Sequence, residues 1–384
     1  FETIAELFES EKDRKSLETF VDEQLYDLDI LYRGVSYLAE LTRRSLDMIS
    51  SFGEILSSKI LSAYLNDRGI KTTWLDARTF LITDGAFGKA APLMETTKSK
   101  TSGAVMPEVA AGRVVVTQGF IGATSEGVTT TLGRGGSDYS AAIIGVACDA
   151  KEIQIWTDVD GMLTADPRVV PDATIIEQVT FNEASELAYF GAKVLHPLTI
   201  KPAIENAIPV RILNSMKPQG KGTVITAQAE QEGAICAIAS KKGITALFIS
   251  SLSMLGTHGY LARVFSIFDR FKTPIDLIST SEVSVSLTID NTENLESLVE
   301  ALADLADVSV MQSVAIVSVV GRQFREKTGI AGSVFDALKD TNILMISGGA
   351  SNINLSFLVA EKDADQAVIK LHDRFFARAG SQSP

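Results

Sequence analysis

Residues 129–138 combine glycines and polar side chains that could hold an anion. Their sequence, Thr-Thr-Thr-Leu-Gly-Arg-Gly-Gly-Ser-Asp, follows an apolar run and precedes a helix-like pattern over residues 139–148. Glycines let the backbone approach a ligand closely, and free N–H groups at a helix N-terminus attract negative charge. Arg134 adds a planar fork that suits a carboxylate or a phosphate. The alternative is a plain tight turn capped by Ser137 or Asp138, because a lone glycine-rich loop is weak evidence of a site.

The composition describes a folded, acidic chain. Its 384 residues are 46% hydrophobic with only 10 prolines, which is enough for two or three domains with their own cores. The net charge of −13 argues against a nucleic-acid partner, because binding the phosphate backbone needs a basic face. An anionic ligand would need locally basic pockets, for which Arg134, Arg168 and Lys193 are candidates. Two distant cysteines, Cys148 and Cys236, predict a reducing compartment rather than a disulfide framework.

Metal and membrane signals are weak in this sequence. The three histidines, His196, His258 and His372, have no spacing that resembles a zinc site, so we predict no metal ligands. No apolar run approaches the length of a membrane span. The sequence begins with Phe1 rather than Met, so we expect the natural N-terminus to lie upstream, and targeting cannot be judged.

Helices and strands alternate over the first 213 residues. Residues 1–70 are expected to be helical, with an apolar stripe of Leu28, Leu31, Tyr32, Val35, Leu38 and Leu41. Strands are expected at 70–75, 114–117, 152–157 and 209–213, with a polar, flexible stretch at 96–103. Thr180 and Glu183 have capping-box spacing and should open a helix that ends near Gly191. This alternation predicts a mainly parallel sheet.

Several polar residues fall where ligands of such sheets bind. Thr117, Thr157 and Asp158 lie at the C-terminal ends of expected strands. Glu54 stands beside a glycine ahead of an apolar helix, which by itself indicates only a favourable acid in a first helical turn.

The last third of the chain contains a repeat. Residues 214–233 are rich in Gly, Lys, Gln and Pro and are expected to be a linker. Beyond them, two segments of about seventy residues each predict the order strand, helix, strand, strand, helix. The apolar positions alternate at 283–289 and again at 353–359. We therefore expect two small modules with the ferredoxin-like pattern, and a purely structural or dimerising role is the alternative to a regulatory one.

Four motifs in a fixed order resemble the aspartate kinases of the amino acid kinase family. They are residues 129–138, 156–159, 166–170 and 190–197, and the second half of the chain resembles a pair of ACT regulatory modules. The resemblance implies an α/β amino acid kinase domain over 1–230, with helices on both faces of its sheet. It implies two α+β, ferredoxin-like ACT modules over 235–312 and 313–384, with room for an exchange of terminal segments between them.

The resemblance also implies an activity. Such enzymes transfer the γ-phosphoryl group of ATP, with Mg²⁺ on the phosphates, to the β-carboxylate of L-aspartate and form 4-phospho-L-aspartate (EC 2.7.2.4), the first step towards lysine, threonine and methionine. By motif, Arg134 would bind a substrate carboxylate and Glu54 the α-ammonium group. Phe120 and Ser137 would border the aspartate, and Asp138 would hold the catalytic groups in place. The implied nucleotide-binding residues are Thr157, Asp158, Arg168, Lys193 and Val194.

Two departures from the family pattern stand out. The family begins with a Lys-Phe-Gly-Gly-Thr-Ser strand and loop, whose lysine stabilises the transferring phosphoryl group, and this sequence lacks it. Residues 1–32 resemble a region well inside the family sequence, so we expect the leading segment to be missing from the chain as given. A molecule truly without that lysine should be nearly inactive. In addition, Leu163 stands where the family often has an aromatic residue, which weakens adenine stacking there.

Residues 253–261 and 274–284 are similar to lysine-inhibited aspartokinases, in which the effector lies between ACT modules of two subunits. Two acids would then attract a cationic effector, and the turn at 259–261 would offer backbone groups for its carboxylate. The expected L-lysine site comprises Met254, Thr257, Gly259, Tyr260, Leu261, Asp276, Ser281 and Glu282. We expect a monofunctional, cytoplasmic enzyme (plastid if from a plant) that forms a homodimer or tetramer through its ACT modules.

Two other functions remain open at this stage. Another amino acid kinase, acting on glutamate or N-acetylglutamate, is the nearest alternative. A Glu54 that binds a free ammonium argues against an acylated substrate, and paired ACT modules favour aspartate. A non-catalytic, effector-binding chain is the alternative from a different class, and the missing lysine loop motivates it. The sequence favours a lysine-inhibited aspartate kinase.

Overall fold

The computed structural model describes residues 1–8, 10–190, 197–228, 235–324, 326–349 and 351–376. The chain divides into two compact units, Phe1–Trp156 with Leu195–Arg211 and Thr157–Val194 with Ile212–Pro384. We describe each unit by itself. Within the described residues, no helix has the length and apolar character needed to cross a membrane.

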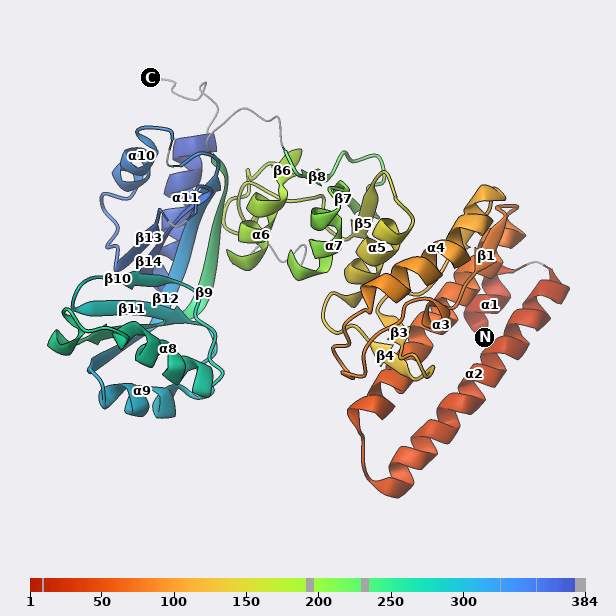
Figure 1. Cartoon of the computed structure of the whole chain (residues 1–384). Coiled ribbons are helices and arrows are strands. Elements are labelled where there is room, and N and C mark those ends of the chain that lie inside the picture. Colours follow the sequence, from red (N-terminus) through yellow and green to blue (C-terminus); the bar gives the residue numbers. More distant parts are fainter. Residues whose placement is uncertain (9, 191–196, 229–234, 325, 350, 377–384) are drawn as a thin grey trace, which may run out of the picture. The chain divides into compact units, whose positions relative to one another are not determined.

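Three helices open the first unit, as the apolar spacing of residues 1–70 predicts (Figure 1). Ser10 and Thr42 cap the second and third helices, because their hydroxyl groups accept hydrogen bonds from Asp13 N–H and Ser45 N–H. The expected apolar stripe is only partly buried, and Leu38, at the end of the second helix, is 76% exposed. The helices are α1 (Glu2–Leu7), α2 (Glu11–Leu38) and α3 (Arg43–Asp67).

A parallel pair of strands follows, β1 (Thr72–Trp74) and β2 (Val114–Val116), close to the predicted positions. The expected flexible stretch at 96–103 is wrong, because these residues belong to α4 (Met94–Ala110). Two of its polar residues, Thr97 and Thr101, are buried, so the polar composition is misleading. Thr97 is fully buried, and its hydroxyl both donates to the carbonyl of Ile82 and accepts from the N–H of Ile82.

The glycine-rich stretch is preceded by a hairpin that the sequence does not predict. β3 (Ile121–Ala123) and β4 (Thr129–Thr131) pair antiparallel, and α5 (Gly136–Ala147) follows them. These elements pack with α3 around one hydrophobic cluster, in which Ile55, Ile121 and Ile143 are almost completely buried. The cluster therefore holds α3, the hairpin and α5 in one rigid arrangement.

The strands between residues 72 and 226 form several small sheets. The described strands form two two-stranded sheets, β1-β2 and β3-β4, and a four-stranded sheet in the order β5-β7-β8-β6. This differs from the single, mainly parallel sheet expected. The predicted linker at 214–233 is also wrong in part, because β8 lies inside it and pairs parallel with β6. The elements are β5 (Ile153–Thr157), β6 (Gln178–Thr180), α6 (Phe181–Phe190), α7 (Lys201–Glu205), β7 (Val210–Asn214) and β8 (Thr223–Thr226).

The capping box of α6 is confirmed. The hydroxyl of Thr180 accepts from Glu183 N–H at 3.3 Å, and the N–H of Thr180 donates to the Glu183 carboxylate at 2.7 Å.

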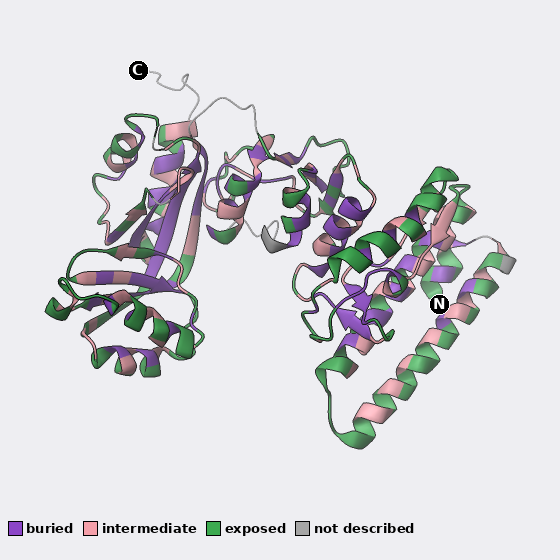
Figure 2. Ribbon diagram, in the orientation of Figure 1, coloured by how far each residue is buried: buried purple, intermediate pink, exposed green. Residues whose placement is uncertain are grey.

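The last part of the second unit is one six-stranded antiparallel sheet in the order β10-β11-β9-β12-β14-β13. Its element order confirms the predicted repeat, and Figure 2 shows its central strands largely buried. β9 and β12 each run through both halves of the sheet, so the two repeats share strands. The elements are β9 (Ile235–Ser250), α8 (Tyr260–Arg270), β10 (Ile278–Thr280), β11 (Ser284–Ile289), α9 (Leu295–Ala303), β12 (Asp307–Gly321), α10 (Ile330–Ala337), β13 (Met345–Gly348), β14 (Asn354–Ala360) and α11 (Glu361–Phe376).

Candidate active site and effector pocket

The glycine-rich turn joins β4 to the N-terminus of α5. Gly133 (φ 78°) and Gly135 (φ 70°) both adopt the left-handed conformation, which glycine tolerates without strain. A Cβ atom at Gly133 would lie 2.9 Å from the carbonyl oxygen of Gly88, so packing also requires glycine there. Gly135 is the N-cap of α5, and no side chain caps the helix. The prediction of Ser137 or Asp138 as the cap is therefore wrong, since both lie in the first helical turn.

Arg134 and Asp138 flank this helix N-terminus. Arg134 is exposed, and no carboxylate lies within ion-pair distance of it in the part of the chain that the structure describes. Asp138 is partly buried, and this burial raises the pKa of its carboxyl group. A guanidinium without a partner next to uncapped N–H groups suits an anionic ligand.

Phe120 is held in a strained backbone conformation against the same turn. Its φ of 68° is unusual for a bulky residue. Two hydrogen bonds fix it, from Phe120 N–H to the Ser140 hydroxyl at 2.9 Å and from Leu132 N–H to the Phe120 carbonyl at 2.9 Å. A Cβ on Gly136 would lie 2.7 Å from the Phe120 ring, and one on Gly119 would lie 3.1 Å from Cβ of Ser137. The structure thus brings the predicted residues Phe120 and Ser137 to one place.

Glu54 lies in the middle of α3, so its interpretation as a first-turn acid is wrong. Its side chain is partly buried, which raises the pKa of its carboxyl group. α3 packs against β4, the strand that leads into the glycine-rich turn. A partly desolvated carboxylate gains more from an ammonium ligand than one in open water.

Asp47 is a site-supporting residue that sequence reasoning missed. It is 2% exposed, and its carboxylate accepts three hydrogen bonds, from Gly88 N–H at 2.9 Å, Thr131 N–H at 2.9 Å and the Thr131 hydroxyl at 2.8 Å. Asp47 therefore ties α3, which carries Glu54, to the strand and the loop that support Arg134. No local sequence signal marks this role, because both partners are distant in the sequence.

The predicted nucleotide residues belong to the second unit. Thr157 ends β5 and its hydroxyl donates to the Asp158 carboxylate at 3.1 Å. Asn214 steadies the turn that follows by donating to Asp160, which also accepts from Lys217 Nζ at 2.7 Å. The loop is thus a hydrogen-bonded structure at the C-terminal end of a strand, where ligands of α/β sheets bind.

Arg168 lies near this loop in sequence but is already paired. Its guanidinium forms a two-pronged contact with Asp166, with a shortest distance of 2.6 Å, and its side chain is 86% exposed. To contact a phosphate, Arg168 would have to exchange that carboxylate for the ligand. Lys193 and Val194 lie outside the described residues.

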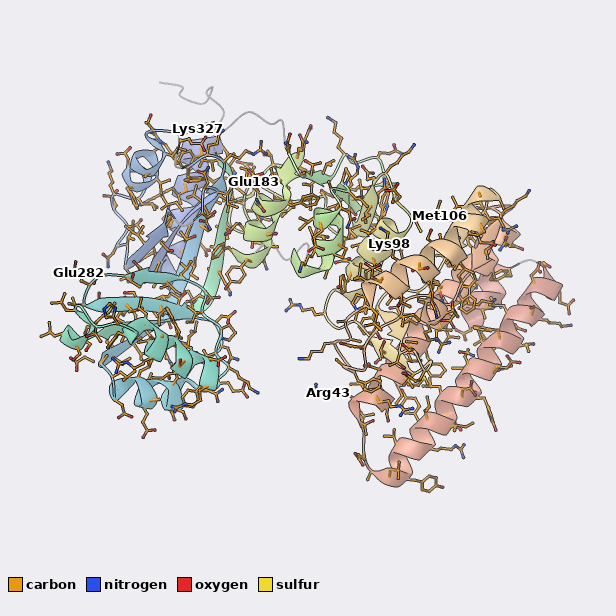
Figure 3. The ribbon with its side chains drawn as sticks, in the orientation of Figure 1. Arg43, Lys98, Met106, Glu183, Glu282 and Lys327 are labelled. Atoms are coloured by element: carbon orange, nitrogen blue, oxygen red, sulfur yellow. The ribbon has the colours of Figure 1, made fainter. Side chains whose placement is uncertain are left out.

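A pocket of about 720 Å³ opens at the N-terminus of α8. Gly259 (φ 76°) is the N-cap, and no side chain caps the helix. Glu282 adds a carboxylate to the rim (Figure 3). Helix N–H groups and a carboxylate in one pocket complement the two charges of an amino acid. Six of the eight predicted effector residues line it, namely Met254, Thr257, Gly259, Tyr260, Leu261 and Glu282.

Asp276 and Ser281 do not line this pocket. The side chain of Asp276 is 3% exposed and forms an ion pair with Lys241 at 2.8 Å. The Ser281 hydroxyl lies 2.7 Å from the Ser284 hydroxyl and accepts from Ser284 N–H, so it closes the turn between β10 and β11. The structure therefore separates these two residues from the other six.

The described residues contain no cluster of three or more His, Cys, Asp or Glu side chains that could hold a metal ion. A dedicated protein cage for Mg²⁺ is thus not formed by these residues. Mg²⁺ commonly reaches phosphoryl-transfer sites on the phosphates of the nucleotide, with one or two protein carboxylates.

Comparison with known proteins identifies the family. The amino acid kinase family model matches residues 8–214, and the ACT domain model matches residues 317–375. Lysine-sensitive aspartokinase 3 of Escherichia coli is 39% identical over 363 residues, which cover 91% of this chain and 81% of that protein. Aspartokinase 2, chloroplastic, of Arabidopsis thaliana is 40% identical over 376 residues, 93% of this chain and 69% of that protein.

Two solved structures of the E. coli enzyme, aspartokinase III, are also similar. The complex with aspartate and ADP (R-state) has a TM-score of 0.79, and the complex with lysine and aspartate (T-state) has a TM-score of 0.80. Each is 38% identical and covers 94% of this chain and 82% of the other. The chain belongs to the amino acid kinase family. Within it the relatives place the chain among the aspartokinases, EC 2.7.2.4, with a regulatory region that contains an ACT domain.

Proposed function

We propose that this chain transfers the γ-phosphoryl group of ATP to the β-carboxylate of L-aspartate, and that L-lysine inhibits the reaction from the regulatory region. The observation that carries the proposal is the arrangement at the glycine-rich turn. There Arg134, which has no ion-pair partner among the described residues, lies next to the uncapped N-terminus of α5, and both features suit a carboxylate substrate. The similarity to an aspartokinase complex with aspartate and ADP supports the same substrates.

Each side chain of the aspartate site has a separate task. Arg134 binds the α-carboxylate with its planar fork, and Glu54 binds the α-ammonium group. Phe120 and Ser137 form the wall beside them, and the strained backbone of Phe120 holds that wall in one position. Asp138, in the first turn of α5, keeps the reacting groups aligned. Phosphoryl transfer depends mainly on such positioning and on charge neutralisation.

The nucleotide is held by the loop after β5. Thr157 and Asp158 offer a hydroxyl and a carboxylate to the ribose and base, and Arg168 and Lys193 offer positive charge to the phosphates. Val194 would border the nucleotide. Because Arg168 is paired with Asp166 in the structure, its contribution requires an exchange of partners on nucleotide binding.

The pocket at α8 is the effector site in this proposal. The N–H groups of residues 259–261 bind the lysine carboxylate, and Glu282 attracts an ammonium group. The name of the lysine-sensitive E. coli relative, and its structure with lysine in the T-state, support this assignment. We further propose two ACT modules, over 235–312 and 313–384, behind a kinase domain at 1–230, and a homodimer or tetramer formed through these modules.

The test is ADP release from ATP and Mg²⁺, measured with L-aspartate, with glutamate, with N-acetylglutamate and with no acceptor, each with and without L-lysine. Calorimetry measures lysine binding in parallel. Aspartate-dependent turnover that lysine suppresses supports both parts of the proposal. Turnover without lysine sensitivity retains the kinase and contradicts the effector. Turnover with glutamate or N-acetylglutamate in place of aspartate identifies another amino acid kinase. Lysine binding without any turnover identifies the non-catalytic, effector-binding chain.

A further inference from the structure

One face of α6 is attached to the regulatory sheet at three evenly spaced points. Glu183, Glu186 and Tyr189 follow one another at intervals of three residues, which places them on the same side of the helix. All belong to the same compact unit as the regulatory sheet. Each side chain contacts a different part of that sheet.

The first two attachments are an ion pair and a hydrogen bond. Glu183 is fully buried, and its carboxylate accepts from Arg322 Nε at 2.7 Å while it also closes the capping box (Figure 3). The carboxylate of Glu186 accepts from Asn354 Nδ2 at 2.6 Å. These contacts join the start of α6 to Arg322, the residue after β12, and the middle of α6 to β14. Burial of the Glu183–Arg322 pair makes that first contact costly to break.

The third attachment is different, because several groups share it. The Tyr189 hydroxyl donates to Asp276 Oδ1 at 2.7 Å, and Lys241 Nζ lies 2.8 Å from the same oxygen. Lys241 also lies 2.8 Å from Asp290 Oδ2, and its Nζ is 4.9 Å from the centroid of the Tyr189 ring. Burial and the Asp276 carboxylate raise the pKa of Tyr189, so its hydroxyl remains a donor.

Among the described residues, this cluster has one more negative charge than positive charges. Asp276 and Asp290 bring two carboxylates, and Lys241 brings one ammonium group. Asp276 Oδ2 is buried and has no hydrogen-bond partner among the residues that the structure describes. A buried carboxylate oxygen without a partner is costly, so the cluster is poised to change when charges nearby change. Tyr189 itself is 44% exposed, which leaves its contact with Asp276 free to open.

The cluster is connected to the effector pocket by the shortest strand of the sheet. Asp276 lies two residues before the first residue of β10, and Glu282 of the pocket lies two residues after its last residue. β10 has three residues and lies at the edge of the sheet, where β11 is its one paired strand among the described residues; the Ser347 hydroxyl of β13 also donates to the Ile278 carbonyl at 3.3 Å. A shift of Glu282 on effector binding therefore reaches Asp276 through a single short segment.

The end of α6 is close in sequence to a residue that we propose for nucleotide binding. Tyr189 is the next-to-last residue of α6, and Lys193 follows four positions later in the sequence. We propose that the contact among Tyr189, Asp276 and Lys241 is the link through which the effector pocket controls nucleotide binding. This inference rests on the proposed regulation by L-lysine. It makes Tyr189 a positioning residue that acts through α6.

The test uses the whole chain and its Tyr189→Phe variant, which loses one hydroxyl and keeps the ring. Calorimetry measures the Kd for L-lysine, and the Kd for ATP with and without saturating L-lysine, all without aspartate. In the wild type we expect lysine to change the Kd for ATP by about fivefold or more, the lower end of usual allosteric coupling. In Tyr189→Phe we expect lysine to bind within about threefold of wild type and to change the Kd for ATP by less than about twofold. Wild-type coupling in this variant overturns the proposal.

Two matched controls isolate the cluster. Tyr37→Phe removes the same hydroxyl from a side chain that is 90% exposed, and it should keep wild-type coupling. Lys241→Met and Lys242→Met change neighbouring lysines, but Lys242 pairs with Asp365 at 2.7 Å and does not belong to the cluster. We expect loss of coupling in Lys241→Met and its retention in Lys242→Met. Equal coupling in the two lysine variants contradicts the link.

The failure of the proposed effector is distinguishable from the failure of the link. A wild-type chain that binds ATP but no lysine contradicts the effector assignment. The link then requires that Lys241→Met shift the Kd for ATP by about threefold or more relative to Lys242→Met, even without effector. Equal values in these two variants overturn the link in that case also. A wild-type chain that binds no ATP contradicts the proposed function and the link together.

Discussion

Replacing Asp47 by alanine should destabilise the strand and the loop that support Arg134 in the proposed aspartate site. The change removes the acceptor for three hydrogen bonds that join α3 to β4 and to the Gly88 loop. Gly88 is exposed, so water can replace its lost partner, but Thr131 is 3% exposed and its N–H would remain unsatisfied. An unsatisfied buried donor costs about 1–3 kcal/mol, and with the weakened Gly88 contact we expect about 2–4 kcal/mol in total.

The same substitution should reduce substrate binding more than its stability cost explains. β4 leads through Leu132 to Gly133 and Arg134, so loss of the Asp47 contacts lets the Arg134 fork move. We expect the KM for aspartate to rise about tenfold while the KM for ATP stays within about twofold, since a misplaced charged contact costs about 1.4 kcal/mol or more. Urea unfolding and initial rates measure the two effects.

Asp47→Asn is the matched control for this prediction. Its amide oxygen can accept from both N–H groups, and its NH₂ can donate to the Thr131 hydroxyl, which is able to accept. The asparagine variant should therefore retain most of the stability and the KM for aspartate, because the role of Asp47 is geometric. An alanine variant with unfolding and KM values equal to wild type would refute the reasoning, and so would an asparagine variant as impaired as alanine.

Three further predictions concern charged groups. Arg134→Lys should lower kcat/KM for aspartate about 10- to 150-fold, because hydrogen bonds between charged groups contribute about 1.5–3 kcal/mol and lysine lacks the planar fork; initial rates check this, and a near-normal value contradicts the site. Burial raises the pKa of Glu54 above 4.5, so its charge is lost at a higher pH than usual as the pH falls. The KM for aspartate should therefore rise on acidification, beginning above pH 4.5, and Glu54→Gln should show a high KM without that dependence; parallel profiles would disprove the role. Glu282→Gln should raise the lysine concentration for half-inhibition about 1.4-fold to fivefold, because an exposed ion pair contributes about 0.2–1 kcal/mol; an unchanged midpoint excludes Glu282 from lysine binding.

Local rules in the sequence predicted the parts of the fold that depend on near neighbours. The capping box of α6 is an example, because Thr180 and Glu183 are three residues apart and satisfy each other's backbone groups. The repeated order of strands and helices after residue 235 is another, since alternating apolar residues determine which side of a strand is buried. Both features could be predicted without knowledge of the rest of the molecule.

The features that sequence reasoning missed depend on distant partners. α4 looks polar, yet Thr97 bonds to Ile82 and faces the interior. Asp47 bonds to residues 41 and 84 positions away, so nothing in its own surroundings distinguishes it from an ordinary surface acid. The cap of α5 was misplaced because the helix begins earlier than its sequence indicates: Gly135 is the N-cap in a left-handed conformation, and Ser137 already lies in the first turn.

The pocket at α8 contains residues that the sequence predicted correctly and lacks others that the sequence also assigned to it. The six predicted residues that line it come from the continuous stretch 254–261 and from Glu282 in the turn after β10. Asp276 carries the charge that a cationic effector requires, and the sequence therefore grouped it with them. Lys241, 35 positions earlier, pairs with that charge in the structure, which no pattern in the sequence indicates.

The shared strands of the regulatory sheet bear on how this region can be divided. Residues 235–244 of β9 pair with residues 314–321 of β12, while the other ends of the same two strands belong to the first repeat. A fragment limited to residues 317–375 would lack β9, so one edge of β12 would lose its partner strand. Val317 and Val319 of that strand are fully buried in the whole chain, and an unpaired edge that carries such apolar residues promotes aggregation. In a chimeric enzyme, the two repeats therefore cannot be exchanged one at a time. A transferred regulatory region must contain everything from β9 through α11 in order to fold.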